Sequence, residues 1–181
     1  MDTNCTPVQP SECVDEIGPT TDRTTQYHAR LTGFGDRHKL IADLTDALGP
    51  GSPPSVLAVF DLVGSSEYRR VFGEQASDEL IARLAEQFAR VVQPTGVCYR
   101  PRQDEFCALI NRPIDDVRTM LFAAKDALKD EEESSLITAW FGAAFLPDEA
   151  ADPIDALMLT DERLRFRMES RKPRERRQNT R

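Results

Sequence analysis

Hydrophobic positions recur along this chain at two spacings, which separate helices from strands. Spacings of three and four residues are typical of one face of a helix, and short unbroken apolar runs are typical of buried strands. The helical spacing occurs in four segments, namely 38–48, 78–92, a segment with Pro113 in its first turn that ends near Leu128, and a segment that starts at Asp152-Pro153. The apolar runs are 55–61, 97–100, 105–110 and 136–146.

The order of these segments predicts the fold class. After the first helix the chain reads strand, helix, strand, strand, helix, strand, and it ends with one more helix. This βαββαβ order predicts an α/β (α+β) domain with a ferredoxin-like or palm sheet and flanking helices. The charged stretch 130–135 is expected to be a solvated loop, and Gly142 inside the last apolar run indicates a bulge or a close backbone approach.

The two ends differ in composition from this central domain. Residues 1–27 are rich in Thr, Pro, Ser and acids and show no periodicity, which predicts a disordered leader. Residues 28–170 form the predicted domain, and 171–181 form a basic tail that we also expect to be disordered. The leader offers no room for a sensor domain, so regulation is expected to come through a partner, self-association or expression level.

Charge and cysteine usage narrow the class of partner. The formal net charge is −8, which argues against nucleic-acid binding except through the basic tail. The four cysteines and two histidines show no zinc spacing, and reduced thiols are the default. Cys98 and Cys107 would face each other if the intervening turn were symmetric. There is no signal-peptide pattern and no apolar run long enough for a bilayer, so we predict a cytoplasmic protein.

Acidic residues are placed where two neighbouring strands would meet. In "YRPRQDEFCALI", residues 99–110, Asp104 and Glu105 follow a Pro-led turn, and Asp61 ends the first strand. In the predicted sheet these carboxylates approach each other, and with a backbone carbonyl they suit Mg²⁺. Such a metal lowers the pKa of an attacking hydroxyl and neutralises phosphate charge. Strands also often end in acids that do no chemistry, and spacing alone does not separate the two interpretations.

A turn follows the first strand at Gly64-Ser65-Ser66. It joins a strand to a helix, and backbone N–H groups in such a turn can hold phosphate. Gly64, Ser65 and Ser66 are therefore candidate nucleotide-binding residues.

Four stretches, in the right order, resemble the GGDEF family, whose members condense two GTP into cyclic di-GMP. "LTGFGDR" resembles the family's LTGLxNR opening, and "FDLVGSSEYRRVFGEQASDELI" aligns without gaps on its DIDxFKxINDxxGHxxGDxxL region. "YRPRQDEFCALI" stands in the place of RxGGDEFxxL, and "ITAWFGAAFLPDEAADPIDALMLTDERL" resembles the closing strand and helix. The resemblance runs from about residue 29 to 172. "FDLVGSSEY" is also similar to the first metal motif of class III nucleotide cyclases.

The GGDEF resemblance assigns roles position by position. Asp61 falls on the first metal ligand, Leu62 on a residue whose carbonyl assists it, and Asp104 with Glu105 on the acidic pair that supplies metal ligation and a base. Asp78 falls on the acid that reads guanine, and Arg100 on the arginine before the signature, so both are expected to bind the nucleotide. The resemblance implies GTP as ligand, Mg²⁺ as cofactor, and catalysis between two facing domains.

Several family positions are changed in this chain. Arg102 and Gln103 replace the two signature glycines, where glycine allows the nucleotide to approach the backbone. The remaining changes are Val63 for the second acid, Ser66 for the first lysine, Arg69 for the asparagine beside Asp78, Met168 for a phosphate-contacting lysine, and Gln93 to Gly96 in place of the inhibitory RxxD.

The sequence thus predicts a catalytically impaired GGDEF signalling protein that acts by binding a nucleotide, a protein partner or a second copy of itself. A residual diguanylate cyclase is the main alternative, and a class III nucleotide cyclase is a minor one. Partner docking through the basic tail is a third hypothesis.

Overall fold

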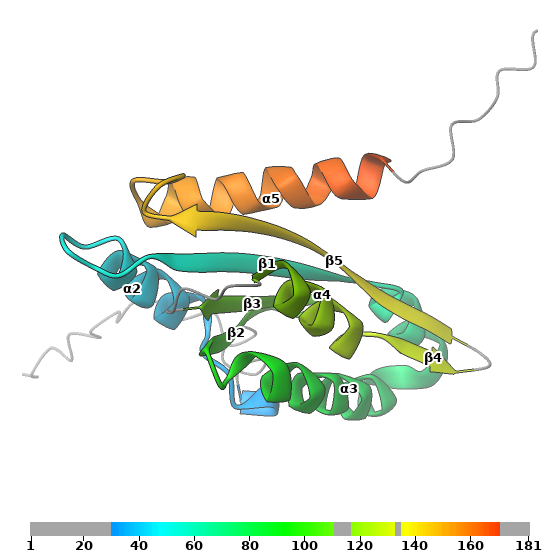
Figure 1. Cartoon of the computed structure of the whole chain (residues 1–181). Coiled ribbons are helices and arrows are strands. Elements are labelled where there is room, and N and C mark those ends of the chain that lie inside the picture. Colours follow the sequence, from blue (N-terminus) through cyan, green and yellow to red (C-terminus); the bar gives the residue numbers. More distant parts are fainter. Residues whose placement is uncertain (1–29, 111–116, 133–134, 171–181) are drawn as a thin grey trace, which may run out of the picture.

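The fold is a curved antiparallel sheet covered by helices on both faces (Figure 1). The computed structural model describes residues 30–110, 117–132 and 135–170. The strands are β1 (Ser55–Val63), β2 (Gly96–Arg102), β3 (Glu105–Ile110), β4 (Asp130–Glu132) and β5 (Ser135–Leu146). The helices are α2 (Arg37–Ala47), α3 (Ser65–Val92), α4 (Val117–Ala127) and α5 (Pro153–Ser170).

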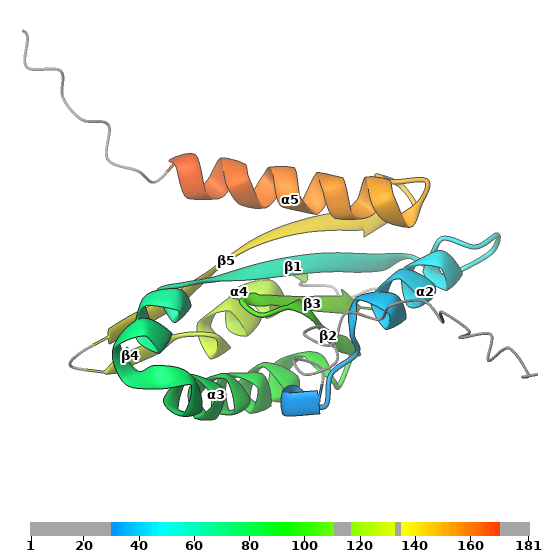
Figure 2. The same ribbon diagram turned by 180° about the vertical axis from the view of Figure 1, so that it is seen from behind.

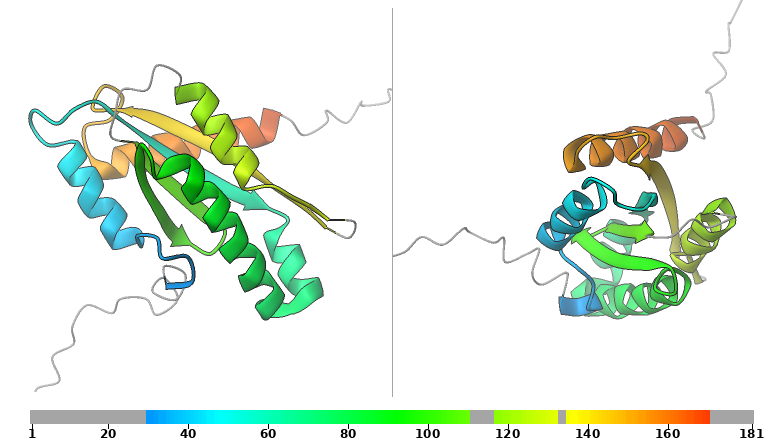
Figure 3. Two further views of the ribbon diagram at one scale, coloured as in Figure 1. Left: turned by 60° about the horizontal axis from the view of Figure 1, so that its bottom comes forward. Right: turned by 60° about the vertical axis from the view of Figure 1, so that its left-hand side comes forward.

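The sheet order is β2-β3-β1-β5-β4, which confirms the predicted ferredoxin-like arrangement. The central strand β1 pairs antiparallel with both β3 and β5. Helices α3 and α4 cover one face of the sheet and α2 and α5 the other, as the end-on view in Figure 3 shows. Alternation along the strands sends successive side chains into two separate apolar cores, one under each pair of helices.

Most predicted elements are present, but α3 begins earlier than its apolar stripe indicates. It runs from Ser65 and bends at Gly73, where φ is 87°. The first segment exposes Val71 and Phe72, so it carries no buried stripe from which a helix could be predicted. This early turn of α3 is visible beside the end of β1 in Figure 2.

The expectation of a solvated loop at 130–135 is wrong for its first part. Residues Asp130–Glu132 form β4, which pairs with the start of β5. Backbone pairing needs no apolar side chain, and the Asp130 carboxylate also accepts a hydrogen bond from Arg83 at 3.0 Å. Residues 133 and 134 lie outside the described part.

The register of the hairpin overturns the symmetric arrangement of its cysteines. Cys98 pairs with Ala108, whereas Tyr99 pairs with Cys107, and the register shifts before Arg102. Cys98 and Cys107 consequently point into opposite cores, where both are free thiols.

Gly142 provides the predicted close backbone approach. A Cβ atom at this position would lie 1.9 Å from the Thr160 carbonyl oxygen and 2.8 Å from the Leu164 nitrogen. Helix α5 can therefore pack directly on β5 only because residue 142 has no side chain.

The predicted leader and tail lie outside the described residues, as does most of the stretch before α4, including Pro113. Within the described ranges, no helix is both long and apolar enough to cross a membrane.

Candidate functional site

The predicted acids gather at one end of β1 and β3. Asp61 and Glu105 are direct partners in the register of the two strands, so their side chains leave the same face of the sheet. The backbone N–H of Leu62 donates to the carbonyl of Asp104 at 2.8 Å, which ties the hairpin turn to the end of β1. The structure thus brings Asp61, Leu62, Asp104 and Glu105 together, as the sequence predicted.

Asp104 is already engaged by two side chains of α3. The Ser66 hydroxyl lies 3.3 Å from its Oδ2, and the Arg69 guanidinium Nη2 lies 3.7 Å from its Oδ1. The Arg69 and Asp104 side chains are 26% and 29% exposed, so the pair is partly shielded from water. A cation of the chain itself therefore lies beside the first acid of the signature.

Glu105 has a comparable partner from its own hairpin. The Arg102 guanidinium donates to Glu105 Oε2 at 3.4 Å. Burial raises the pKa of Glu105; Arg102 opposes this shift, while the charges of Asp161 and Asp61 add to it. A half-buried carboxylate beside other acids holds its proton more tightly than a free one.

The pKa of Asp61 is raised as well. Burial raises its pKa most, the charges of Asp104 and Asp161 raise it further, and Arg102 lowers it. Asp161 belongs to α5, and sequence reasoning did not select it. Only its place on the helix that covers this face brings its charge to the acids.

The turn between β1 and α3 depends on glycine at its first position, and phosphate binding there stays a prediction. Gly64 has φ 96°, and a Cβ there would lie 2.5 Å from the Leu136 carbonyl oxygen. The buried Ser65 hydroxyl is turned inward and lies 3.4 Å from the Leu62 carbonyl oxygen. Ser66 is exposed at the start of the helix and borders Asp104, whereas Gly64 lies against β5 and Ser65 supports the turn.

Arg100 has a different environment from the one expected of a nucleotide ligand. Its side chain is 1% exposed. Its Nε and Nη2 donate to the Gln103 carbonyl at 3.2 and 2.8 Å, and its guanidinium lies 5.8 Å from the centre of the Phe106 ring. These contacts favour a structural role in which Arg100 holds the signature turn from below.

Asp78 lies on α3 beyond the Gly73 bend and is half-buried. It is on the same helix as Arg69 but in the segment after the bend. Its role in reading guanine stays a prediction.

Comparisons with known proteins agree with this arrangement. The family model described as "Diguanylate cyclase, GGDEF domain" matches residues 26–174. The chain belongs to the GGDEF family.

Solved structures share the GGDEF fold at low sequence identity. A sensory box/GGDEF family protein from Caulobacter crescentus is 21% identical with a TM-score of 0.66, covering 79% of this chain and 98% of that one. The GGDEF domain of DgcB from the same organism, in complex with c-di-GMP, is 22% identical with a TM-score of 0.65, covering 77% of this chain and 86% of that one.

A third neighbour is a longer protein. The diguanylate cyclase SiaD from Pseudomonas aeruginosa, in complex with its activator SiaC, is 18% identical with a TM-score of 0.67. The match covers 81% of this chain but 60% of SiaD. A sequence comparison with curated proteins finds no match.

GGDEF cyclases generally use Mg²⁺, and the donor set of this chain can be tested against that requirement. Among the described residues, no three His, Cys, Asp or Glu side chains converge as a metal site. Asp104 faces Arg69, Glu105 faces Arg102, and the Leu62 carbonyl faces the Ser65 hydroxyl. Asp104 Oδ1 lacks a hydrogen-bond partner, whereas Asp104 Oδ2, Glu105 Oε2 and the Leu62 carbonyl each face a donor, so the donor set as arranged is only partly open to a divalent cation.

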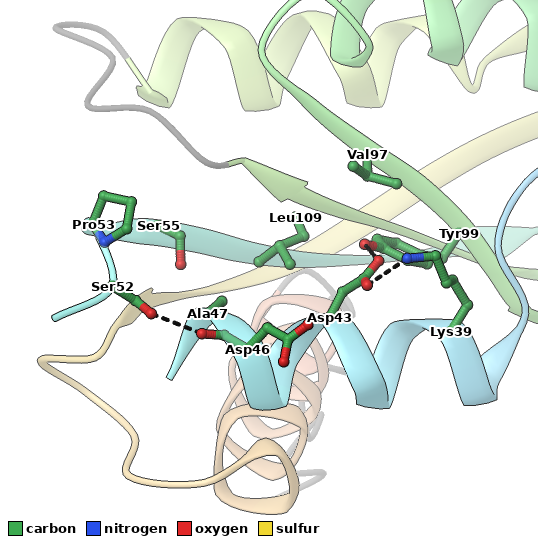
Figure 4. Close-up of a pocket in the computed structure, with 10 residues that line it drawn as sticks. All are labelled: Lys39, Asp43, Asp46, Ala47, Ser52, Pro53, Ser55, Val97, Tyr99 and Leu109. Atoms are coloured by element: carbon green, nitrogen blue, oxygen red, sulfur yellow. Dashed lines mark hydrogen bonds and ion pairs between the residues drawn. The ribbon is translucent and has the colours of Figure 1, made fainter. Parts of the chain in front are cut away.

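A separate cavity of about 420 Å³ lies between α2 and the β1–β3–β2 part of the sheet (Figure 4). On its wall the Tyr99 hydroxyl donates to Asp43 at 2.6 Å, and Lys39 pairs with the same carboxylate. Burial acts to raise the pKa of Asp43, but the bonds from Lys39 and Tyr99 outweigh it and the pKa is lowered. This network joins α2 to the hairpin, and no sequence motif pointed to it.

Proposed function

We propose that this GGDEF domain acts in cyclic di-GMP signalling by binding a nucleotide or a protein partner, with turnover impaired. The observation that carries the proposal is the pairing of both signature acids with arginines of the chain, Arg69 on Asp104 and Arg102 on Glu105. A guanidinium beside a carboxylate offsets the negative charge that would otherwise attract a divalent cation.

The signature turn supports the same proposal. Its two central positions carry Arg102 and Gln103, and the Gln103 carbonyl is held by the buried Arg100. The space that glycines would leave for a nucleotide is reduced by two long side chains, and catalysis between facing domains tolerates little misplacement. GTP, if bound, is therefore expected to lie in a pose from which condensation is slow.

Titration calorimetry of GTP with Mg²⁺, followed by chromatography of the same solution for cyclic di-GMP, tests the proposal. We expect either saturable heat without product or no heat, and product formation at a rate typical of an enzyme would refute impaired turnover. With saturable heat, Asp78→Asn should weaken binding, whereas Asp148→Asn, on an exposed turn, provides the matched loss of one charge.

If no heat appears, the protein-partner form of the proposal remains, with a second copy as the first candidate. Sedimentation velocity at several concentrations measures self-association directly. Among the neighbours, SiaD is seen in complex with the protein SiaC, which provides a precedent for a protein partner in this fold. A chain that neither binds GTP nor associates with itself or with a protein would contradict the proposal.

Residual diguanylate cyclase activity is the second candidate. It is favoured by the direct pairing of Asp61 with Glu105 and by the raised pKa of each, which burial produces and which suits a proton acceptor. Slow cyclic di-GMP formation that Glu105→Gln abolishes would support this candidate. Product formation unaffected by both Glu105→Gln and Asp104→Ala would refute it.

A further inference from the structure

A groove with an unusual charge balance lies on the outer edge of β5, away from the acids. It has a volume of about 650 Å³, within the range of small-molecule sites. Helix α4 forms one wall and α5 the other, and β5 passes between them, as the right-hand view of Figure 3 shows. The acids lie instead between β1 and β3, so β5 and β1 separate the two places.

Three arginines line this groove, against one carboxylate. Arg163 is fully engaged, because it pairs with both oxygens of Glu149 at 2.6 and 2.7 Å and also donates to the Ala143 carbonyl. Arg167 donates once, to the Phe141 carbonyl at 3.0 Å, and stacks 4.4 Å from the Phe141 ring centre. Arg118, on α4, lies 5.8 Å from the centre of the Phe122 ring.

Protection of an open sheet edge explains part of this arrangement. Beyond its pairing with β4, the outer edge of β5 offers backbone groups, and Arg163 and Arg167 cover two of its carbonyls. Covering the strand edge explains the position of Arg163. It does not account for Arg118, which among the described residues makes neither an ion pair nor a bond to the strand.

Among the described lining residues, Arg118 and Arg167 therefore carry positive charges that are not paired with a carboxylate. Burial lowers the pKa of Arg167, and the charges of Arg118 and Arg163 lower it further. In a chain of net charge −8, such a concave positive site is against the general trend. An anion between Arg118 and Arg167 would relieve the repulsion and meet the guanidinium donors in their preferred forked geometry.

The rest of the lining is aromatic. Phe122 and Phe145 are 44% and 49% exposed on the α4 and β5 sides of the groove. Exposed rings beside arginines suit a planar group, which packs on them by its face or edge. We propose that this groove is a second ligand site, for a phosphate monoester carried on a planar ring, of about the size of a mononucleotide.

The test uses phenyl phosphate as the smallest probe of this chemistry, titrated into the full chain and followed by amide chemical shifts. The expected shifts lie at Phe122, Phe145 and Arg167. Inorganic phosphate should bind about tenfold more weakly, because it lacks the ring, and GMP should bind at the same residues. Shifts confined to the Gly64–Arg69 turn, or no saturable shift, would overturn the proposal.

Arg118→Gln is the decisive variant, since within the described ranges this side chain makes no ion pair or hydrogen bond. Loss of one charged hydrogen bond to phosphate should weaken binding about tenfold. Arg90→Gln, on α3, removes one exposed arginine that pairs with Glu86 and should leave the affinity unchanged. Equal affinities for wild type and Arg118→Gln would refute the site. Arg167→Lys, which keeps the charge but loses the fork, should also bind more weakly.

Discussion

Removing the positive charge of Arg69 should restore affinity of the acidic site for a divalent cation. The Arg69–Asp104 pair is separated by 3.7 Å. At that distance a unit charge pair is worth about 1 kcal/mol in bulk water and about 4.5 kcal/mol at an effective dielectric constant of ~20. With both side chains roughly a quarter exposed, screening holds the net value near the lower figure, about 1 kcal/mol.

Arg69→Gln keeps a long polar side chain and removes this charge. A free energy of about 1 kcal/mol corresponds to about a fivefold gain in cation affinity, which Mn²⁺ titration followed by electron paramagnetic resonance measures. The matched control is Arg70→Gln, the next residue on α3, because Arg70 pairs with the exposed Glu67 and not with Asp104. At physiological salt, screening should keep the effect of the control below about twofold.

Equal gains in Arg69→Gln and Arg70→Gln would show that only overall charge matters, and no gain in either would show that Arg69 does not compete with a cation. Both results refute the reasoning. A double variant, Arg69→Gln with Asp104→Asn, should lose the gain, because the carboxylate that it releases is absent.

Three further predictions concern stability. Gly142→Ala should cost about 1–3 kcal/mol and lower the melting temperature by circular dichroism, because its Cβ meets the Thr160 carbonyl; an unchanged melting temperature would contradict the packing. The folded state raises the pKa of Glu105, so ionisation of this carboxyl destabilises the fold as the pH rises above 4.5, the ordinary pKa of Glu. Glu105→Gln should therefore lose less stability than wild type between pH 4 and 7 in urea unfolding, and parallel curves for the two proteins would contradict this. Tyr99→Phe should cost about 1 kcal/mol through loss of the 2.6 Å bond to Asp43, and no change in the urea midpoint would argue against that bond.

The sequence predicted the sheet well because buried strands need apolar runs, and β1, β3 and β5 each have one. The order of the strands along the chain then limits how they can pair, and this predicted that Asp61 lies beside the signature acids. Strand β4 was missed because Asp130–Glu132 is charged, and it is held by backbone pairing and the Arg83–Asp130 hydrogen bond. The first segment of α3 was missed for the related reason that its apolar side chains are exposed.

The sequence located the acidic site but did not predict which side chains pair with its acids. Arg69 stands where the resemblance places a guanine-reading residue, yet it contacts Asp104, because α3 starts at Ser65 and its first segment passes beside the hairpin turn. The positions of Cys98 and Cys107 in opposite cores were also unpredictable from the sequence. They follow from the register shift between Tyr99 and Arg102, a local irregularity that apolar spacing does not encode. Arg100, a candidate nucleotide-binding residue in the sequence, is buried and donates to the Gln103 carbonyl, a contact that depends on the local geometry of the turn.

Helix α5 connects the packing of the domain to the chemistry of its acids. Asp161 lies on this helix, and its charge adds to the effect of burial in raising the pKa of both Asp61 and Glu105. The helix reaches that position because Gly142 allows its backbone to touch β5 next to Thr160, the residue that precedes Asp161. With Asp104, four carboxylates lie near the end of β1, and Arg69 and Arg102 each lie beside one of the signature acids. Each signature acid thus has a cation of the chain beside it, while the remaining excess of negative charge adds to burial in keeping the pKa of Asp61 and Glu105 raised.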